Sequence, residues 1–186
     1  MASRVTKPPM TKDSLLPLLA AHVLAEGLGQ ASLRPLARAA GTSDRMLLYH
    51  FSSKEGLISD LLGFIARIYA AALDAAIGGG RAATRAEVVT RILAQGDAPE
   101  MQPFLALWWE IVAGAARNVP GYEAAARAMM DELLSWLETQ MPADDPDPHG
   151  GACYLLTLIE GTLMLIAIGH GATAQQGLLA SGLAPS

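Results

Sequence analysis

Positions 43 to 54 gather side chains that can bind phosphate groups and the edges of bases. The segment reads SDRMLLYHFSSK. An arginine guanidinium can donate two hydrogen bonds to guanine, and a methionine can contact the methyl group of thymine. Phenol, imidazole and ammonium groups can bind phosphate oxygens, which positions a protein on a duplex. The pattern predicts contacts with double-stranded DNA from Ser43, Arg45, Met46, Tyr49, His50 and Lys54.

A short helix from Thr42 or Ser43 to about Phe51 would present these groups on one side. At 100° per residue, Leu47 and Phe51 share one face of such a helix, while Arg45 points the opposite way together with Tyr49. An ordinary surface helix carries short polar groups and charges on its outer face. The guanidinium and phenol found here instead favour a helix that enters a groove of DNA.

Three short helices are expected ahead of a long one, over about 14–26, 32–40, 43–51 and 54–77. The glycine-containing turn at Gly41 joins the second and third, which is the pattern of a helix-turn-helix. Ser52 and Glu55 form an S-x-x-E capping box at the start of the fourth. Lys54 beside the free N–H groups of that helix start is placed to bind phosphate.

Composition favours an all-helical chain whose charge is unevenly spread. The hydrophobic fraction is 52%, mostly Ala and Leu, with few alternating runs of β-branched residues. Net charge is −5, yet residues 1–60 hold seven basic and five acidic residues, which leaves +2. The remainder holds six basic and 13 acidic residues, or −7. Only the first third of the chain could therefore attract phosphate.

The chain has few side chains of the kinds that catalyse reactions, which argues against an enzyme. The chain has four His and one Cys, with no glycine-rich phosphate loop and neither H-E-x-x-H nor G-x-S-x-G. We therefore expect no catalytic residues, cofactor or metal. Cys153 lies in an apolar run and is interpreted as a buried, inert thiol. Asp144, Asp145, Asp147 and His149 lie in a proline-containing loop and are interpreted as a solvated turn rather than metal ligands.

With positions 41–57 described, the chain resembles the TetR family of bacterial transcriptional regulators. The resemblance rests on SLRPLARAAGTSDRMLLYHFSSKEGL, residues 32–57. It implies an all-α fold in which a three-helix helix-turn-helix domain, residues 1–52, is joined by the long fourth helix to a helical ligand-binding and dimerisation domain, residues 53–186. It also implies a homodimer that reads two half-sites. Where Met46, Leu48, Tyr49 and His50 stand, the family commonly has Thr, Tyr, His and Tyr, so base preference is not carried over.

The C-terminal part offers candidates for an effector site and a dimer seam. FLALWWEIV, residues 104–112, is consistent with a pocket for a small apolar effector or with plain core. Glu110 would be a counter-charge for a cationic ligand or simply exposed. The candidate effector residues are Phe104, Trp108, Trp109, Glu110 and Met129. The candidate dimer residues are Leu133, Trp136, Leu155, Leu158 and Thr162.

The apolar stretch over 152–168 favours burial in protein over burial in lipid. It falls just short of the roughly 20 residues of a membrane span, and Glu160 lies in its middle. A helix that is apolar all round needs cover on most sides, which a second subunit would supply. We therefore expect a homodimer without a membrane partner, in the cytoplasm.

Two functions remain open from the sequence. One is a ligand-responsive homodimeric repressor that binds an operator. The alternative is a helical dimer that binds a small molecule or a protein and does not bind DNA, which the Met46 and Leu48 pair and the acidic total charge support. Arg4 and Lys7 fit either an arm that enters the minor groove or a disordered tail.

Overall fold

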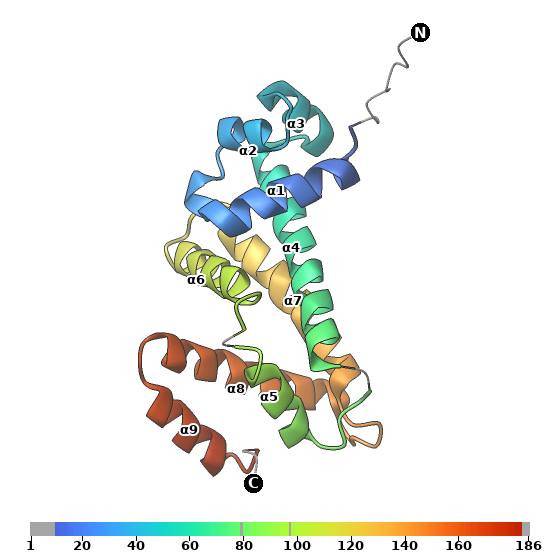
Figure 1. The fold of residues 1–186 in the computed structure, drawn as a ribbon, viewed down its shortest axis with the longest axis vertical. Coiled ribbons are helices and arrows are strands. Elements are labelled where there is room, and N and C mark those ends of the chain that lie inside the picture. Colours follow the sequence, from blue (N-terminus) through green and yellow to red (C-terminus); the bar gives the residue numbers. More distant parts are fainter. Residues whose placement is uncertain (1–9, 79, 97, 184–186) are drawn as a thin grey trace. The chain divides into compact units, whose positions relative to one another are not determined.

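The computed structural model describes residues 10–78, 80–96 and 98–183, and these residues form helices, turns and loops without a strand. The predicted all-α class is confirmed. Arg4 and Lys7 lie outside the described residues. The helices, shown in Figure 1, are α1 (Lys12–Glu26), α2 (Leu33–Ala39), α3 (Asp44–Phe51), α4 (Lys54–Ile77), α5 (Arg85–Leu93), α6 (Gln102–Ala116), α7 (Tyr122–Gln140), α8 (Pro148–Ala167) and α9 (Gly171–Ala180), with a 3₁₀ turn η1 (Leu28–Gln30) after α1.

Contacts divide the chain into two compact units. The first comprises residues 1–65 and 106–126, and the second comprises residues 66–105 and 127–186. The helix-turn-helix thus shares a unit with the start of α4, most of α6 and the beginning of α7. The predicted division at residue 52 separates a DNA-binding part from a ligand-binding part, and it does not follow the boundary of the two compact units. It stays a prediction.

The first helix begins earlier than its sequence pattern suggested. Thr11 is the N-cap: its side chain accepts a hydrogen bond from the N–H of Ser14, and the Ser14 hydroxyl accepts one from the N–H of Thr11. This reciprocal pair is a capping box, so Ser14 is its distal member and not the cap. Pro17 consequently lies inside the helix, beyond its first turn.

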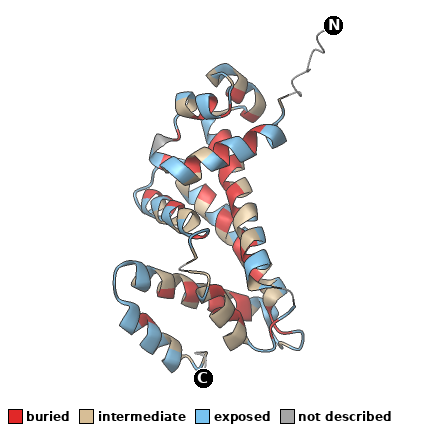
Figure 2. Cartoon of the chain, viewed as in Figure 1, coloured by how far each residue is buried: buried red, intermediate tan, exposed pale blue. Residues whose placement is uncertain are grey.

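Apolar side chains from α1, α2, α3, α4 and α6 form the core of the first unit. Their buried positions are red in Figure 2. The most deeply buried are Leu15, Leu19, Leu36, Leu47, Phe51, Leu57, Leu61, Leu62, Ile65 and Ile111. Lys12 adds a link at the edge, since its Nζ lies 2.7 Å from Asp60 Oδ2 and 5.2 Å from the centre of the Phe51 ring. This core holds α3 as a rigid platform.

In the second unit, an ion pair holds the loop before α8 against the start of α5. Asp145 accepts hydrogen bonds from Arg85 Nε at 2.7 Å and Nη2 at 2.6 Å, and from the N–H of Asp147 at 3.0 Å. Its side chain is only 3% exposed. The interpretation of this loop as a solvated turn is therefore wrong at Asp145, because Arg85 reaches it from 60 positions away in the sequence.

The pairing predicts how stability responds to acid. The Arg85 guanidinium, followed by the N–H of Asp147, lowers the pKa of Asp145 from 3.8 to about 2. A carboxyl group whose pKa is lowered by folding stabilises the fold fully at pH values above its pKa in the unfolded chain. That contribution is lost as pH falls from about 4 toward 2. Asp145→Asn should therefore unfold at lower urea concentration than the wild type at pH 7, with the difference shrinking as pH approaches 2. A gap that stayed constant across this pH range would contradict the assignment.

Two helices have the length and hydropathy that a membrane span requires. They are α4 and α8, whose apolar windows are 39% and 28% buried within the structure. The first of these helices carries the core positions of the helix-turn-helix unit on its inner face. The second leaves most of its apolar surface without cover from its own chain.

Candidate nucleic-acid interface

The turn between α2 and α3 is closed by backbone hydrogen bonds. The N–H of Thr42 donates to the carbonyl of Ala37 at 2.9 Å, and that of Gly41 donates to Arg38 at 3.1 Å. Gly41 has φ +63°, a conformation that favours glycine. Ser43 then caps α3, because its hydroxyl accepts a hydrogen bond from the N–H of Met46 at 3.3 Å. The predicted helix-turn-helix is confirmed.

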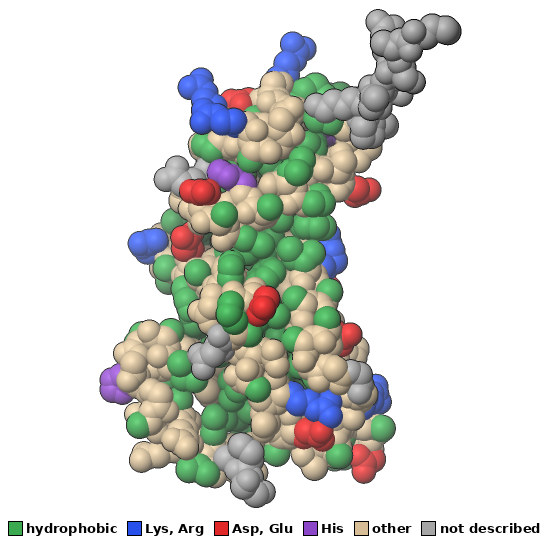
Figure 3. All heavy atoms as spheres, viewed as in Figure 1, with side chains coloured by type: hydrophobic (Ala, Val, Ile, Leu, Met, Phe, Trp, Pro, Cys, Tyr) green, Lys and Arg blue, Asp and Glu red, His purple; other side chains and the backbone are tan. Residues whose placement is uncertain are grey.

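The inner and outer faces of α3 fall where the helical wheel placed them. Leu47 and Phe51 are 0% and 2% exposed, whereas Tyr49 is 76% exposed and Arg45 also lies on the surface. In Figure 3, Lys and Arg side chains project from the end of this unit that carries α2 and α3. A buried inner face fixes the helix, so the guanidinium and the phenol stand on a rigid support.

The remaining predicted contacts on α3 are less exposed. Met46 and His50 are half-buried. The His50 ring lies edge-on to the Tyr49 ring, with centroids 5.2 Å apart and an interplanar angle of 79°. Its Nε2 atom is buried and has no hydrogen-bond partner among the described residues. Tyr49 is therefore the better placed of the two for a phosphate.

The capping box predicted at Ser52 and Glu55 is wrong. Ser52 ends α3 with φ +68°, while an N-cap residue adopts extended backbone. The cap of α4 is Ser53, whose hydroxyl accepts a hydrogen bond from the N–H of Gly56 at 2.9 Å. Lys54 is then the first residue of α4 and is exposed. Its placement at a helix start is as predicted.

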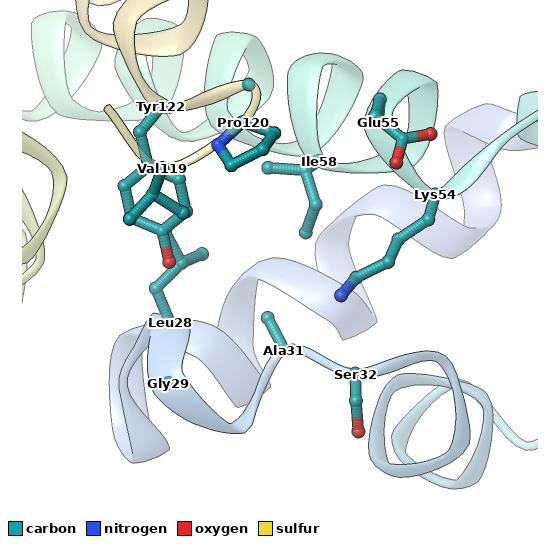
Figure 4. Close-up of a pocket in the computed structure, with 11 residues that line it drawn as sticks. Leu28, Gly29, Ala31, Ser32, Lys54, Glu55, Ile58, Val119, Pro120 and Tyr122 are labelled. Atoms are coloured by element: carbon teal, nitrogen blue, oxygen red, sulfur yellow. The ribbon is translucent and has the colours of Figure 1, made fainter. Parts of the chain in front are cut away.

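A cavity of about 390 Å³ lies within the first unit, beside the starts of η1 and α4. Figure 4 shows the Lys54 amine extending toward Ala31 and Ser32. Ser32 precedes α2, and its side chain makes no capping hydrogen bond to that helix. The Lys54 ammonium thus lies next to two helix N-termini, where an anion is favoured, whereas the Ser32 hydroxyl points away from it (Figure 4).

Glu110 on α6 binds the turn that follows α1. Its Oε2 accepts a hydrogen bond from the N–H of Leu28 at 2.6 Å. Gly27 has φ +80°, and a Cβ there would lie 2.6 Å from Glu110 Oε1. Neither interpretation from sequence, a ligand counter-charge or a simply exposed group, included this contact. The carboxylate therefore has a structural partner in the DNA-binding unit.

The candidate effector residues are divided between the two units. Trp108, Trp109 and Glu110 belong to the first unit, and Phe104 and Met129 belong to the second. Both tryptophans are half-buried, while Met129 is buried. The Phe104 ring packs on a neighbour that the sequence did not suggest, because it lies 5.1 Å from the Tyr69 ring, centroid to centroid.

Two cavities of the second unit are lined by residues other than those five. One, of about 30 Å³, lies between α4, α5, α7 and α8 and is bordered by Tyr69, Trp136 and Glu160. Burial, with a smaller contribution from Glu160, raises the pKa of Tyr69 to about 12. The other, of about 420 Å³, is an apolar groove between α5, α8 and α9. Tyr69 and Glu160 are polar groups in apolar surroundings. The sequence signal that could have identified Glu160 is a glutamate inside an otherwise apolar helix.

Most candidate dimer residues have partners within their own chain. Leu133, Leu155 and Thr162 are 9%, 0% and 4% exposed in the single chain. Trp136 donates its indole N–H to Asp74 at 3.4 Å, and Leu158 packs partly buried against the core of the second unit. The large apolar side chains that α8 and α9 expose are Tyr154, Met164, Ile166, Ile168 and Leu179. Any interface at these helices would therefore be formed chiefly by that second set.

Comparisons with known proteins agree with this architecture. Residues 19–61 match the family described as bacterial regulatory proteins, tetR family. No curated protein matches the chain in sequence. Among solved structures, a protein from Rhodococcus sp. assigned to the TetR-family transcriptional regulators is 22% identical, with a TM-score of 0.66 over 91% of this chain and 94% of that one. The regulator SCO7518 from Streptomyces coelicolor A3(2) is 24% identical, with a TM-score of 0.67 over 92% of this chain and 98% of that one.

A third similar structure is a multidrug binding protein, EbrR, complexed with imidazole. It is 16% identical to this chain, with a TM-score of 0.62 over 100% of this chain and 98% of that one. At these identities the structural likeness shows the fold, while the sequence match covers the helix-turn-helix and the start of α4. Residues 19–61 thus match a domain of the bacterial regulatory proteins of the tetR family, and the chain as a whole has the fold of TetR-family regulators.

Proposed function

We propose that this DNA-binding regulator is a homodimeric repressor that releases its operator when a small apolar molecule binds. The observation that carries the proposal is the outer face of α3. Arg45 and Tyr49 are exposed there, opposite the buried Leu47 and Phe51, on a helix capped by Ser43. Such a helix can enter the major groove while the core behind it stays intact.

The side chains divide into those that read bases and those that hold the backbone. Arg45 takes a guanine edge with two hydrogen bonds, and Met46 contacts a thymine methyl group. Tyr49 and Lys54 bind phosphates on either side of the groove, with His50 as a weaker contact. Ser32 lines the same cavity as Lys54, but its hydroxyl points away from the Lys54 amine (Figure 4).

A dimer follows from the apolar surface that α8 and α9 leave exposed. Met164, Ile166, Ile168 and Leu179 are each 47% to 64% exposed in the single chain. Burying them against a second copy removes that surface from water and pairs two recognition helices. In such a dimer the helices reach half-sites about 34–36 Å apart, or one turn of DNA. The operator is then a palindrome, and the protein acts in the cytoplasm where the chromosome lies.

The effector site is proposed near Phe104, in the second unit. The Phe104 and Tyr69 rings pack on each other and supply apolar surface, and Tyr69 lines a small cavity together with Glu160. The likeness to a multidrug binding protein supports a small-molecule ligand. Helix α4 begins at Lys54 in the DNA-binding unit and ends at Ile77 in the other, so a shift on effector binding is carried along it.

Selection of bound sequences from random DNA, followed by a salt titration, tests the proposal. We expect a palindromic consensus. If each subunit makes three or more phosphate contacts, affinity should fall by about 10³-fold between roughly 50 and 200 mM salt. No enriched sequence, or binding that ignores salt, would instead support a helical module that binds a small molecule or protein without DNA.

A further inference from the structure

Cys153, the one cysteine of the chain, lies beside a histidine and a glutamate in the second unit. Its Sγ atom is 3.8 Å from Nε2 of His149, which precedes it by one turn of α8. The other ring nitrogen, Nδ1, is 2.5 Å from Glu138 Oε1 on α7. The three groups form a chain of contacts from thiol to imidazole to carboxylate. The interpretation of Cys153 as inert did not take His149 into account. Residues four positions apart lie on the same side of a helix, so the imidazole is next to the thiol.

The order of the contacts fixes the role of each group. A carboxylate only accepts hydrogen bonds, so Nδ1 of His149 must donate to Glu138. In the neutral ring, Nε2 then presents its lone pair to the thiol and can take its proton. Glu138 also raises the pKa of His149, through the hydrogen bond first and its charge second, with Asp147 adding a smaller effect. This is the arrangement of nucleophile, base and orienting group that activates a side chain.

Both reacting groups can be reached from solvent in the single chain. Cys153 is half-buried, and the His149 side chain is 70% exposed. His149 and Cys153 lie near the start of α8, whereas Met164, Ile166 and Ile168 lie at its other end. Tyr154 is exposed at this end of α8 as well, but a dimer surface formed by Met164, Ile166, Ile168 and Leu179 leaves the thiol accessible.

We propose that Cys153 is a reactive thiol that adds to α,β-unsaturated carbonyl compounds, with His149 as its base and Glu138 holding that base. The thiol proton passes to Nε2 of His149, and the sulfur electron pair forms a bond to the β carbon. The electrons of the carbon–carbon double bond move to give an enolate, which takes the proton back from His149 at the α carbon. The net change is addition of S–H across the double bond, with no oxidant and no leaving group.

The test is the rate of alkylation of the full-length protein by N-ethylmaleimide, followed by intact mass at neutral pH. One adduct is expected, since Cys153 is the one cysteine, and Cys153→Ser should give none. The native protein should react about tenfold faster than the same protein unfolded in guanidinium, where His149 no longer lies beside the sulfur. This comparison needs no variant that might misfold.

Variants then assign the effect to the base. His149→Gln and Glu138→Gln should bring the native rate down toward the unfolded rate, with folding checked by circular dichroism. His170→Gln is the matched control, because His170 is an exposed histidine at the start of α9 and should leave the rate unchanged. A native rate at or below the unfolded rate, or His149→Gln reacting as fast as the wild type, would overturn the proposal.

Discussion

Replacing Arg45 with alanine should weaken operator binding by about 1–3 kcal/mol per half-site, or roughly 5- to 150-fold. The guanidinium is exposed on the outer face of α3, so its loss removes a contact with guanine without disturbing the core. Preference for the base at that position should relax as well. Fluorescence anisotropy on the selected operator and on single-base variants of it would measure both effects.

Arg67→Ala is the matched control for that experiment. Arg67 is also an exposed arginine, but it lies on α4 in the second unit. The two variants lose the same charge, so a general loss of attraction to DNA would appear equally in both. Equal affinities for Arg45→Ala and Arg67→Ala would show that α3 does not read the operator.

Replacing Phe51 with alanine should lower the free energy of unfolding by about 3–5 kcal/mol. Phe51 is 2% exposed, and the Lys12 ammonium lies over its ring, 5.2 Å from the ring centre. Truncation leaves a cavity beneath the last turn of α3 and removes the support of Arg45 and Tyr49. Urea unfolding followed by circular dichroism measures the loss, and operator affinity should fall with it.

Leu48→Ala distinguishes burial from a general effect of truncation. Leu48 is on the same helix and is 37% exposed. Its truncation should cost under about 1 kcal/mol, since surface changes are usually small. If Leu48→Ala destabilised the protein as much as Phe51→Ala, the inner and outer faces of α3 would have to be exchanged.

The face of α3 could be predicted because it depends on local periodicity alone. The spacing of Leu47 and Phe51 decides which side is covered, whatever covers it. Caps were harder, because two polar residues compete at each helix start. Ser52 and Ser53 are chemically equal, and the positive φ of Ser52 together with the hydrogen bond from Gly56 to Ser53 shows that the second is the cap.

Residues that act through distant partners could not be assigned from the sequence. Leu155 was expected to be covered by a second subunit, yet its own chain buries it. Glu110 meets Leu28 across 82 positions, and Asp145 meets Arg85 across 60. In both cases the packing of other helices brings the partner near. A local sequence pattern cannot predict that packing.

Because Glu110 contacts the turn after α1, the residues allowed at position 27 depend on the residue at position 110. At position 27 any side chain meets both a left-handed backbone and the carboxylate of residue 110. A larger residue at 27 is therefore tolerable only if residue 110 is shortened, and that change gives up the hydrogen bond to Leu28. Among descendants of this chain, glycine at 27 and glutamate at 110 should be inherited or lost together.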